Sequence, residues 1–207
     1  MSTTYLETER LILRPFTTAD VDNLAGLDGD PEVMRYLNGG EPTPREVIQQ
    51  KYLPRYLGEY ERFEGFGHWA AHVRDTGEFV GWFGLCPEGD GNLIAVELGY
   101  RLRPSAWGNG FATEGARGLI RNAFTRLGVE RVLAHTYQDN LASIRVMEKA
   151  GMSLARRFRP TIGDLVTEDD IYRTVVEVWD GDEVEYCLEK ATWVAQEASR
   201  PDERVRT

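Results

Sequence analysis

The sequence predicts one α/β domain whose strands and helices alternate along the chain. The clearest sign lies between residues 96 and 151, where a strand, a glycine-containing turn, a helix, a second strand and a second helix follow in order. The length of 207 residues and the 42% of apolar residues suit one hydrophobic core. No repeat at solenoid spacing and no low-complexity block interrupts the sequence. We expect a single domain over residues 1–193, with residues 194–207 as a flexible tail.

Alternating apolar and polar residues mark the strands of this domain. The first lies at Arg10 to Arg14, and two more form a hairpin around Asp75-Thr76-Gly77. The last three predicted strands are expected to close the sheet. In chain order, the predicted strands span residues 10–14, 67–73, 78–85, 96–102, 131–137, 153–159, 171–178 and 183–188.

Capping residues and prolines mark the helices. Residues 18–20 cap the first helix, and a longer helix that begins at Pro44 is expected to break at Pro54 before it resumes. The helical region that begins at Pro44 is expected to form a lid. In chain order, the predicted helices span residues 18–27, a short segment after Pro31, 44–60, 110–127 and 140–150.

The charge balance bears on the kind of partner. The formal net charge of −10 argues against nucleic acid, because a phosphate-binding face needs clustered Lys and Arg. It weakly favours a cationic acceptor. Acidic residues gather between Asp164 and Glu185, where their field would steer amines, although a solvated face that keeps the protein soluble is the simpler explanation.

Neither a membrane segment nor a metal site is expected. No apolar run approaches the roughly 20 residues of a membrane span, and no signal-peptide core is seen, so we expect a cytoplasmic protein. Cys86 and Cys187 lie far apart without a CxxC or a Cys/His cluster, which favours buried apolar cysteines in a reducing compartment. His68 and His72 share a strand face, but no neighbours complete a metal site or triad, so these residues and His135 are interpreted as core or cleft-wall residues.

The turn from Arg103 to Glu114 is the first candidate site. The start of the following helix offers unpaired backbone N–H groups, and Gly108 and Gly110 would let an anionic ligand approach the backbone. The P-loop ending is absent, and Thr113 stands where the dinucleotide fingerprint needs a third glycine. From spacing alone, a pyrophosphate site and a simple tight turn are equally favoured.

A second pattern, from Asn140 to Gly151, forms a helix with a polar start and a glycine stop. Together with Leu6–Pro15 and Trp107–Glu114, it resembles the GNAT superfamily of N-acetyltransferases, and within it the RimJ/RimL-type branch that acetylates protein N-termini and other amines. The resemblance implies a single mixed, mostly antiparallel sheet, flanked by helices and splayed between strands 96–102 and 131–137.

The resemblance also implies acetyl-CoA as cosubstrate and no metal. The pyrophosphate would lie against the backbone of residues 107–112, and the pantetheine beside Asn140, which taken alone is a good N-cap. Ser105 stands where the family usually has Gln or Arg, so Arg103, with Arg101 as an alternative, would supply the missing charge. The residues expected to bind the cosubstrate are Leu98, Tyr100, Arg103, Ser105, Trp107, Gly108, Asn109, Gly110, Phe111, Ala112, Asn140 and Ser143.

Two residues are expected to be catalytic in a reaction in which an amine attacks the acetyl carbonyl and coenzyme A leaves as a thiolate. Ser143 matches the family position close to the thioester sulfur and would donate to the thiolate, although alone it is an ordinary first-turn helix serine. Glu97 resembles the branch's proposed general base and shares a strand face with Gly99, while an ion pair with an arginine is an equally weighted alternative.

The acceptor is open: a protein N-terminus, an amino acid, a polyamine or a drug amine would each fit a small-molecule or peptide acceptor. A different class of function is a non-catalytic sensor or interaction module that binds acyl-CoA, against which the joint presence of Asn140, Ser143 and Glu97 counts. A longer acyl donor is a third alternative. A homodimer through the late strands is compatible with the sequence, without a specific pattern for it.

Overall fold

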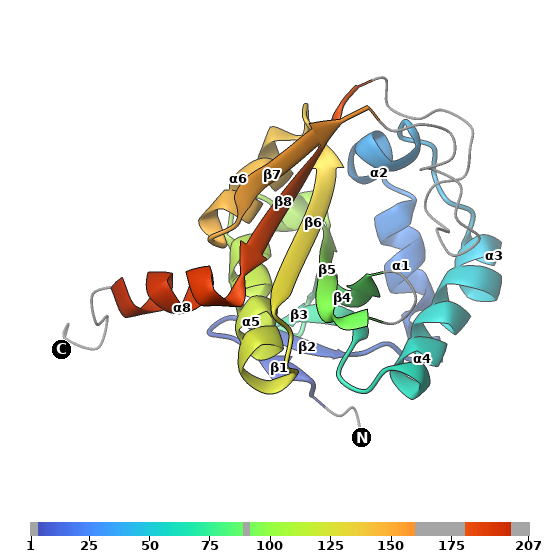
Figure 1. The fold of residues 1–207 in the computed structure, drawn as a ribbon. Helices are drawn as coiled ribbons and strands as arrows, with labels where there is room; N and C mark the ends of the chain where they lie inside the picture. Colours follow the sequence, from blue (N-terminus) through green and yellow to red (C-terminus); the bar gives the residue numbers. More distant parts are fainter. Residues whose placement is uncertain (1–3, 89–91, 160–180, 200–207) are drawn as a thin grey trace.

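The computed structural model describes residues 4–88, 92–159 and 181–199 (Figure 1). Within these residues, eight strands form one sheet in the order β1-β2-β3-β4-β5-β6-β8-β7. Neighbours pair antiparallel except β5 and β6, which run parallel. The predicted mixed, mostly antiparallel sheet is therefore confirmed. The strands are β1 (Leu6–Glu7), β2 (Leu11–Pro15), β3 (Gly67–Val73), β4 (Phe79–Glu88), β5 (Asn92–Leu102), β6 (Arg131–Tyr137), β7 (Ser153–Phe158) and β8 (Glu183–Glu189).

Helices flank this sheet, with α1 to α4 on one side and α5 and α6 on the other (Figure 1). The predicted helices are all present, whereas β1 was not predicted and the strand expected at 171–178 lies outside the described residues. The helical segments are η1 (Thr18–Asp20), α1 (Val21–Asp28), α2 (Pro31–Asn38), α3 (Arg45–Val47), η2 (Ile48–Tyr52), α4 (Leu53–Arg62), η3 (Pro104–Ala106), α5 (Phe111–Arg126), α6 (Leu141–Lys149) and α8 (Lys190–Ser199).

The break predicted at Pro54 is wrong, because the helix absorbs the proline. The segment η2 is a π-helical turn, in which the N–H of Leu53 bonds to the carbonyl of Ile48, and Pro54 then falls in the first turn of α4. The wider π-helical turn before Pro54 accommodates a residue that has no backbone N–H to donate. One continuous run of helix therefore extends from Arg45 to Arg62.

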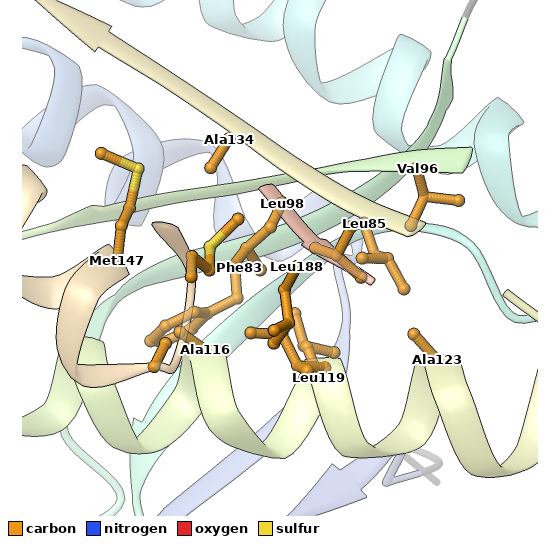
Figure 2. Packing of buried hydrophobic residues seen from close by; sticks show 14 of the residues in the cluster. Phe83, Leu85, Val96, Leu98, Ala116, Leu119, Ala123, Ala134, Met147 and Leu188 are labelled. Carbon is orange, nitrogen blue, oxygen red and sulfur yellow. The ribbon is translucent and has the colours of Figure 1, made fainter. Parts of the chain in front are cut away.

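The two faces of the sheet pack differently because side chains alternate along each strand. On one face, apolar residues of β4 and β5 such as Phe83 and Leu98 pack against α5, as Figure 2 shows. The packing is close: a Cβ added at Gly115 of α5 would lie 2.2 Å from the Phe83 ring. On the opposite face, Trp82 packs with Tyr56 of α4 in a second core cluster. Gly84 of β4 and Gly99 of β5 also lie on this second face, where an added Cβ would meet the His68 and Trp82 rings.

The C-terminal helix α8, Lys190–Ser199, crosses the expected boundary between domain and tail at residues 193 and 194. Trp193 of α8 packs beside Phe124 of α5, with ring centroids 5.5 Å apart, and Gln196 donates to the carbonyl of Gly151. The chain is helical through Ser199, so the flexible tail predicted to start at residue 194 does not start there, and residues 200–207 lie outside the described part. Among the described helices, none has both the length and the apolar character that a membrane crossing requires.

Candidate active site

The cleft of this fold opens where β5 and β6 separate. The two strands pair at Ala95, Val96 and Glu97 of β5, after which β5 continues beside β4 and β6 continues beside β8. A cavity of about 1500 Å³ lies at this point, lined by both strands, α2, α4, the turn before α5 and the start of α6. The predicted splay between strands 96–102 and 131–137 is therefore confirmed.

The turn before α5 reaches this cleft with an open backbone. Gly108 and Gly110 adopt left-handed φ values of 76° and 81°, and a Cβ at Gly108 would meet no atom within 4 Å. Gly110 is the N-cap of the 16-residue helix α5, so the first N–H groups of that helix point toward the turn. Trp107 is 48% exposed and donates its ring N–H to the carbonyl of Leu102 at 2.8 Å. Such a helix start is suited to an anionic ligand.

The start of the chain fastens this turn from outside. The Glu114 carboxylate in the first turn of α5 accepts bonds from the Thr8 hydroxyl at 2.6 Å and from the Arg10 backbone N–H at 2.7 Å. Arg10 also forms a 2.7 Å ion pair with Glu114 and donates to the carbonyl of Asn109. Burial raises the pKa of Glu114, but these bonds outweigh it and lower the pKa overall. The segments Leu6–Pro15 and Trp107–Glu114 are thus bound together into one structural unit.

Most of the residues predicted to bind a cosubstrate line the cleft, and three do not. Those in the lining are Leu98, Tyr100, Trp107, Gly108, Gly110, Phe111, Ala112, Asn140 and Ser143, together with Glu97. Arg103 lies over the Phe79 ring, 4.9 Å from its centroid, and its guanidinium donates to the carbonyl of Asn23 in α1 rather than facing the cleft. Ser105 is exposed outside the lining, and the Asn109 amide bonds back to the carbonyl of Trp107.

Tyr100 and Ser143 meet across the cleft. The two hydroxyls are 2.9 Å apart, and the Tyr100 hydroxyl donates to the Ser143 carbonyl at 3.1 Å. Burial raises the pKa of Tyr100 to about 12, against the lowering effect of the Ser143 bond, so its hydroxyl stays protonated at neutral pH. Asn140 caps α6 by accepting from the Ser143 N–H at 3.2 Å and donates to the Thr136 hydroxyl. The cap fixes the position of Ser143.

Glu97 is the last residue of β5 that pairs with β6, and its side chain is 52% exposed. Its carboxylate is 3.3 Å from His135 Nδ1, and the other ring nitrogen is 3.0 Å from Glu185. Burial lowers the pKa of His135, but the two carboxylates outweigh it and raise the pKa to about 9. Glu97 is therefore paired with a charged histidine instead of the arginine of the alternative interpretation. Its carboxylate is also more exposed to solvent than that of a group enclosed in a cleft.

Sequence reasoning missed two groups on this face of the sheet. Arg101 forms a buried 2.6 Å ion pair with Asp28 of α1 rather than facing the turn. Glu59 and Cys86 both lie beside His68, where the sequence indicated nothing that would supply the rest of a metal site or triad. The predicted hairpin of strands 67–73 and 78–85 could have indicated that Cys86 lies near His68, because His68 pairs with Gly84, two residues before Cys86. Cys86 and Cys187 are both half-buried rather than buried.

The arrangement of splayed strands, anion-binding turn and capped helix can be compared with known proteins. A family model described as "Acetyltransferase (GNAT) domain" matches residues 10–153. The chain belongs to the GNAT acetyltransferase family. It is therefore an acyltransferase, of a family whose members use acetyl-CoA as cosubstrate and amines as acceptors.

Curated relatives agree with this membership. The FsC-acetyl coenzyme A-N(2)-transacetylase of Aspergillus fumigatus is 37% identical over 161 residues, which cover 74% of this chain and 66%, just under two thirds, of that protein. The uncharacterized protein YkkB of Bacillus subtilis is 34% identical over 157 residues, 75% of this chain and 89% of its own length.

Solved structures share the GNAT fold. An acetyltransferase of the GNAT family from Bacillus anthracis superposes with a TM-score of 0.71 at 20% identity, covering 90% of this chain and 98% of that chain. The likeness supports the fold assignment independently of the sequence motifs.

Proposed function

We propose that this GNAT domain transfers the acetyl group of acetyl-CoA directly to a primary amine, in a ternary complex and without a covalent enzyme intermediate. The observation that supports the proposal best is the bonded pair of Tyr100 and Ser143 beside the point where β5 and β6 separate. This pair lies in the same cleft as the anion-binding turn and Glu97. The turn supplies a binding site for acetyl-CoA, the hydroxyl pair supplies a hydrogen-bond donor for the leaving thiolate, and Glu97 supplies a proton acceptor for the amine.

Acetyl-CoA would lie with its pyrophosphate against the N–H groups of residues 108–112 and its pantetheine between the splayed strands. The phosphate charge would be met chiefly by backbone N–H groups and the dipole of α5, because Arg103 and Arg101 are directed to other partners. Backbone binding of this kind needs no basic side chain at position 105. The cleft volume of about 1500 Å³ has room for a pantetheine arm and an acceptor together.

Ser143 would stabilise the leaving thiolate. As the tetrahedral intermediate collapses, the C–S bond breaks and the sulfur takes up negative charge, which a hydroxyl donor lowers in energy. The Tyr100 hydroxyl, protonated because burial raises its pKa to about 12, would in turn donate to Ser143 Oγ. The two hydroxyls can thus stabilise the thiolate through linked hydrogen bonds, without either hydroxyl losing its proton.

Glu97 would accept the proton that the attacking amine loses. An α-amino group has a pKa near 8 and a lysine-like amine near 10, so most acceptors arrive charged at neutral pH and need a base. Glu97 lines the cleft at the level where the strands separate, and its bond to His135 fixes the carboxylate. A half-exposed carboxylate can also pass the proton to solvent.

The acceptor would be a small-molecule or peptide amine that enters between α2 and α4 in a cytoplasmic setting. Both helices line the cleft with residues of both charges, among them Glu32, Arg35, Arg55 and Arg62. The RimJ/RimL-type motifs favour an α-amino group at a peptide N-terminus.

The test is release of coenzyme A thiol from acetyl-CoA in the presence of N-terminal peptides, amino acids, polyamines and aminoglycosides. Selective release with one class, together with mass-spectrometric detection of its acetylated product, would name the acceptor. Tight binding of acetyl-CoA without release for any amine would instead favour the non-catalytic sensor.

A further inference from the structure

Three donor side chains from different elements meet on the acceptor side of the cleft. Glu59 of α4, His68 of β3 and Cys86 of β4 each offer one ligand atom, and these atoms lie within 4.8 Å of one another. The His68 Nδ1 is 2.7 Å from Glu59 Oε2 and 3.8 Å from Cys86 Sγ. His68 is 8% exposed, whereas Glu59 and Cys86 are partly open to the cleft that all three line. The mechanism proposed above uses none of them.

The geometry distinguishes two uses of such a cluster. A cysteine nucleophile activated by a Cys–His–Glu triad needs one ring nitrogen toward the thiol and the other toward the carboxylate. Here Glu59 and Cys86 both approach the same nitrogen, Nδ1 of His68. Three donors that converge on one point are the arrangement of a metal site. Tetrahedral zinc, with bonds of about 2.0 to 2.3 Å, would separate such donors by about 3.3 to 3.7 Å. Glu59 would need to move away from Nδ1 by less than about 1 Å, and donor atoms that lie up to 4.8 Å apart would need to approach each other by about 1 Å.

The surroundings hold the imidazole in place. The Tyr56 ring stacks on His68 with centroids 4.3 Å apart, and the Trp82 ring makes a T-shaped contact with it at a centroid distance of 5.0 Å. Gly84 leaves the space that the ring occupies, because a Cβ there would lie 2.9 Å from His68 Cδ2. Arg55 is 3.5 Å from the other oxygen of the Glu59 carboxylate. Fixed ligands with such second contacts are what a preformed metal site needs.

We propose that Glu59, His68 and Cys86 form a binding site for a divalent transition-metal ion, with zinc as the ion that the donor set suits best. One thiolate, one carboxylate and one neutral imidazole carry two negative charges, which balance a divalent cation, and the mixture of S, N and O donors suits zinc or cobalt. Binding would release the thiol proton of Cys86 and the proton that His68 Nδ1 shares with Glu59.

The fourth position of this site faces the cleft. Cys86 pairs with Glu97 across β4 and β5, so the metal would stand beside the proposed base on the acceptor side. Water or a donor atom of the acceptor would complete the four ligands, as in zinc sites that leave one position open. Metal binding does not depend on acetyl transfer, so either proposal can fail without the other.

The first test measures binding of Zn²⁺ and Co²⁺ to tag-free protein freed of metal with a chelator. Equilibrium dialysis should give one ion per chain, and Co²⁺ should add the visible absorption of a tetrahedral site and a near-ultraviolet thiolate-to-cobalt band. Cys86→Ser should remove that band, and His68→Gln should weaken binding at least tenfold, whereas Cys187→Ser, the matched control, should bind as the parent does. Binding unchanged in Cys86→Ser, or no retained ion in the parent, overturns the proposal.

A second measurement on the unaltered chain guards against variants that fold poorly. Alkylation of each cysteine is followed by peptide mapping with and without Zn²⁺. The ion should slow alkylation of Cys86 at least tenfold and leave Cys187, which lies on β8, unchanged. Equal protection of both cysteines, or protection of neither, contradicts a site at Cys86.

Discussion

The Tyr100 hydroxyl lies 2.9 Å from Ser143 Oγ and so joins β5 to the first turn of α6 across the cleft. The contact connects residues 43 positions apart in sequence, and the Asn140 cap fixes the serine from the other side. Both hydroxyls lie in the lining of the cavity. The pair is thus the most specific feature of the proposed site for the leaving thiolate.

Ser143→Ala should lower kcat by about 10²-fold and change the Kd of acetyl-CoA less than twofold, because the hydroxyl acts on the charge of the leaving thiolate rather than on the bound donor. Steady-state kinetics with the best acceptor and calorimetric titration with acetyl-CoA give the two numbers. Ser105→Ala, at an exposed serine outside the cleft, is the matched control. A kcat equal to that of the parent would remove Ser143 from the mechanism.

Tyr100→Phe should lower kcat by about tenfold, and adding it to Ser143→Ala should cost little more, because the tyrosine acts through the serine. The double-mutant cycle in kcat measures this coupling. Fully additive effects would show that the two hydroxyls act independently, even though they are bonded in the free protein.

Glu97→Gln should lower kcat/KM by about 10²-fold at neutral pH and abolish the decline in rate that protonation of the base causes at acid pH. The measurement is the pH profile of kcat/KM with an amine of known pKa. Glu130→Gln, at a glutamate paired with Lys190 away from the cleft, controls for the loss of a carboxylate. An unaltered profile would leave water or another residue as the base.

His135 should make stability depend on pH. Glu97, Glu185 and, through Glu185, Arg156 face its ring, and the two carboxylates raise its pKa from 6.5 to about 9 despite burial. A raised pKa stabilises the folded chain fully below about pH 6.5, and that contribution is lost as the pH rises through about 9.

The parent should therefore lose up to about 3 kcal/mol more unfolding free energy than His135→Gln between pH 6 and pH 10. Urea unfolding at several pH values measures both curves. Parallel curves would show that the histidine does not gain a proton-linked interaction on folding.

Glu114→Ala should weaken acetyl-CoA binding by about tenfold while leaving kcat at saturation within twofold. The carboxylate ties Thr8 and Arg10 to the first turn of α5, and its loss lets the turn that would bind the pyrophosphate relax. Calorimetry with acetyl-CoA and with coenzyme A gives the affinities. Glu9→Ala, at an exposed neighbour, should bind normally, and equal weakening in both variants would contradict the anchoring role.

Much of the fold could be predicted because local patterns determine it. The alternation in residues 96–102 and 131–137 and the glycines at 108 and 110 gave the strands, the turn and, with the family resemblance, the splay. Pro54 was misjudged because a π-helical turn can absorb a proline without a break, and nothing local distinguishes the two outcomes. The helix through Ser199 depends on Trp193 packing against α5, a tertiary contact.

The site was predictable where one motif contains both partners and not where distant elements meet. Asn140 and Ser143 lie in one helical turn, so their relation followed from spacing. The side-chain directions of Arg103 toward Phe79 and of Arg101 toward Asp28 depend on how α1 and β4 pack on β5. Glu59, His68 and Cys86 come from a helix and two strands, and only the folded sheet brings them together.

The most direct test of the proposed active site is a crystal structure of the protein with coenzyme A. We predict the pyrophosphate on the backbone N–H groups of residues 108–112, the pantetheine between β5 and β6, and the sulfur within hydrogen-bonding distance of Ser143 Oγ. A sulfur far from Ser143, or a coenzyme A that lies outside the splayed strands, would contradict the account.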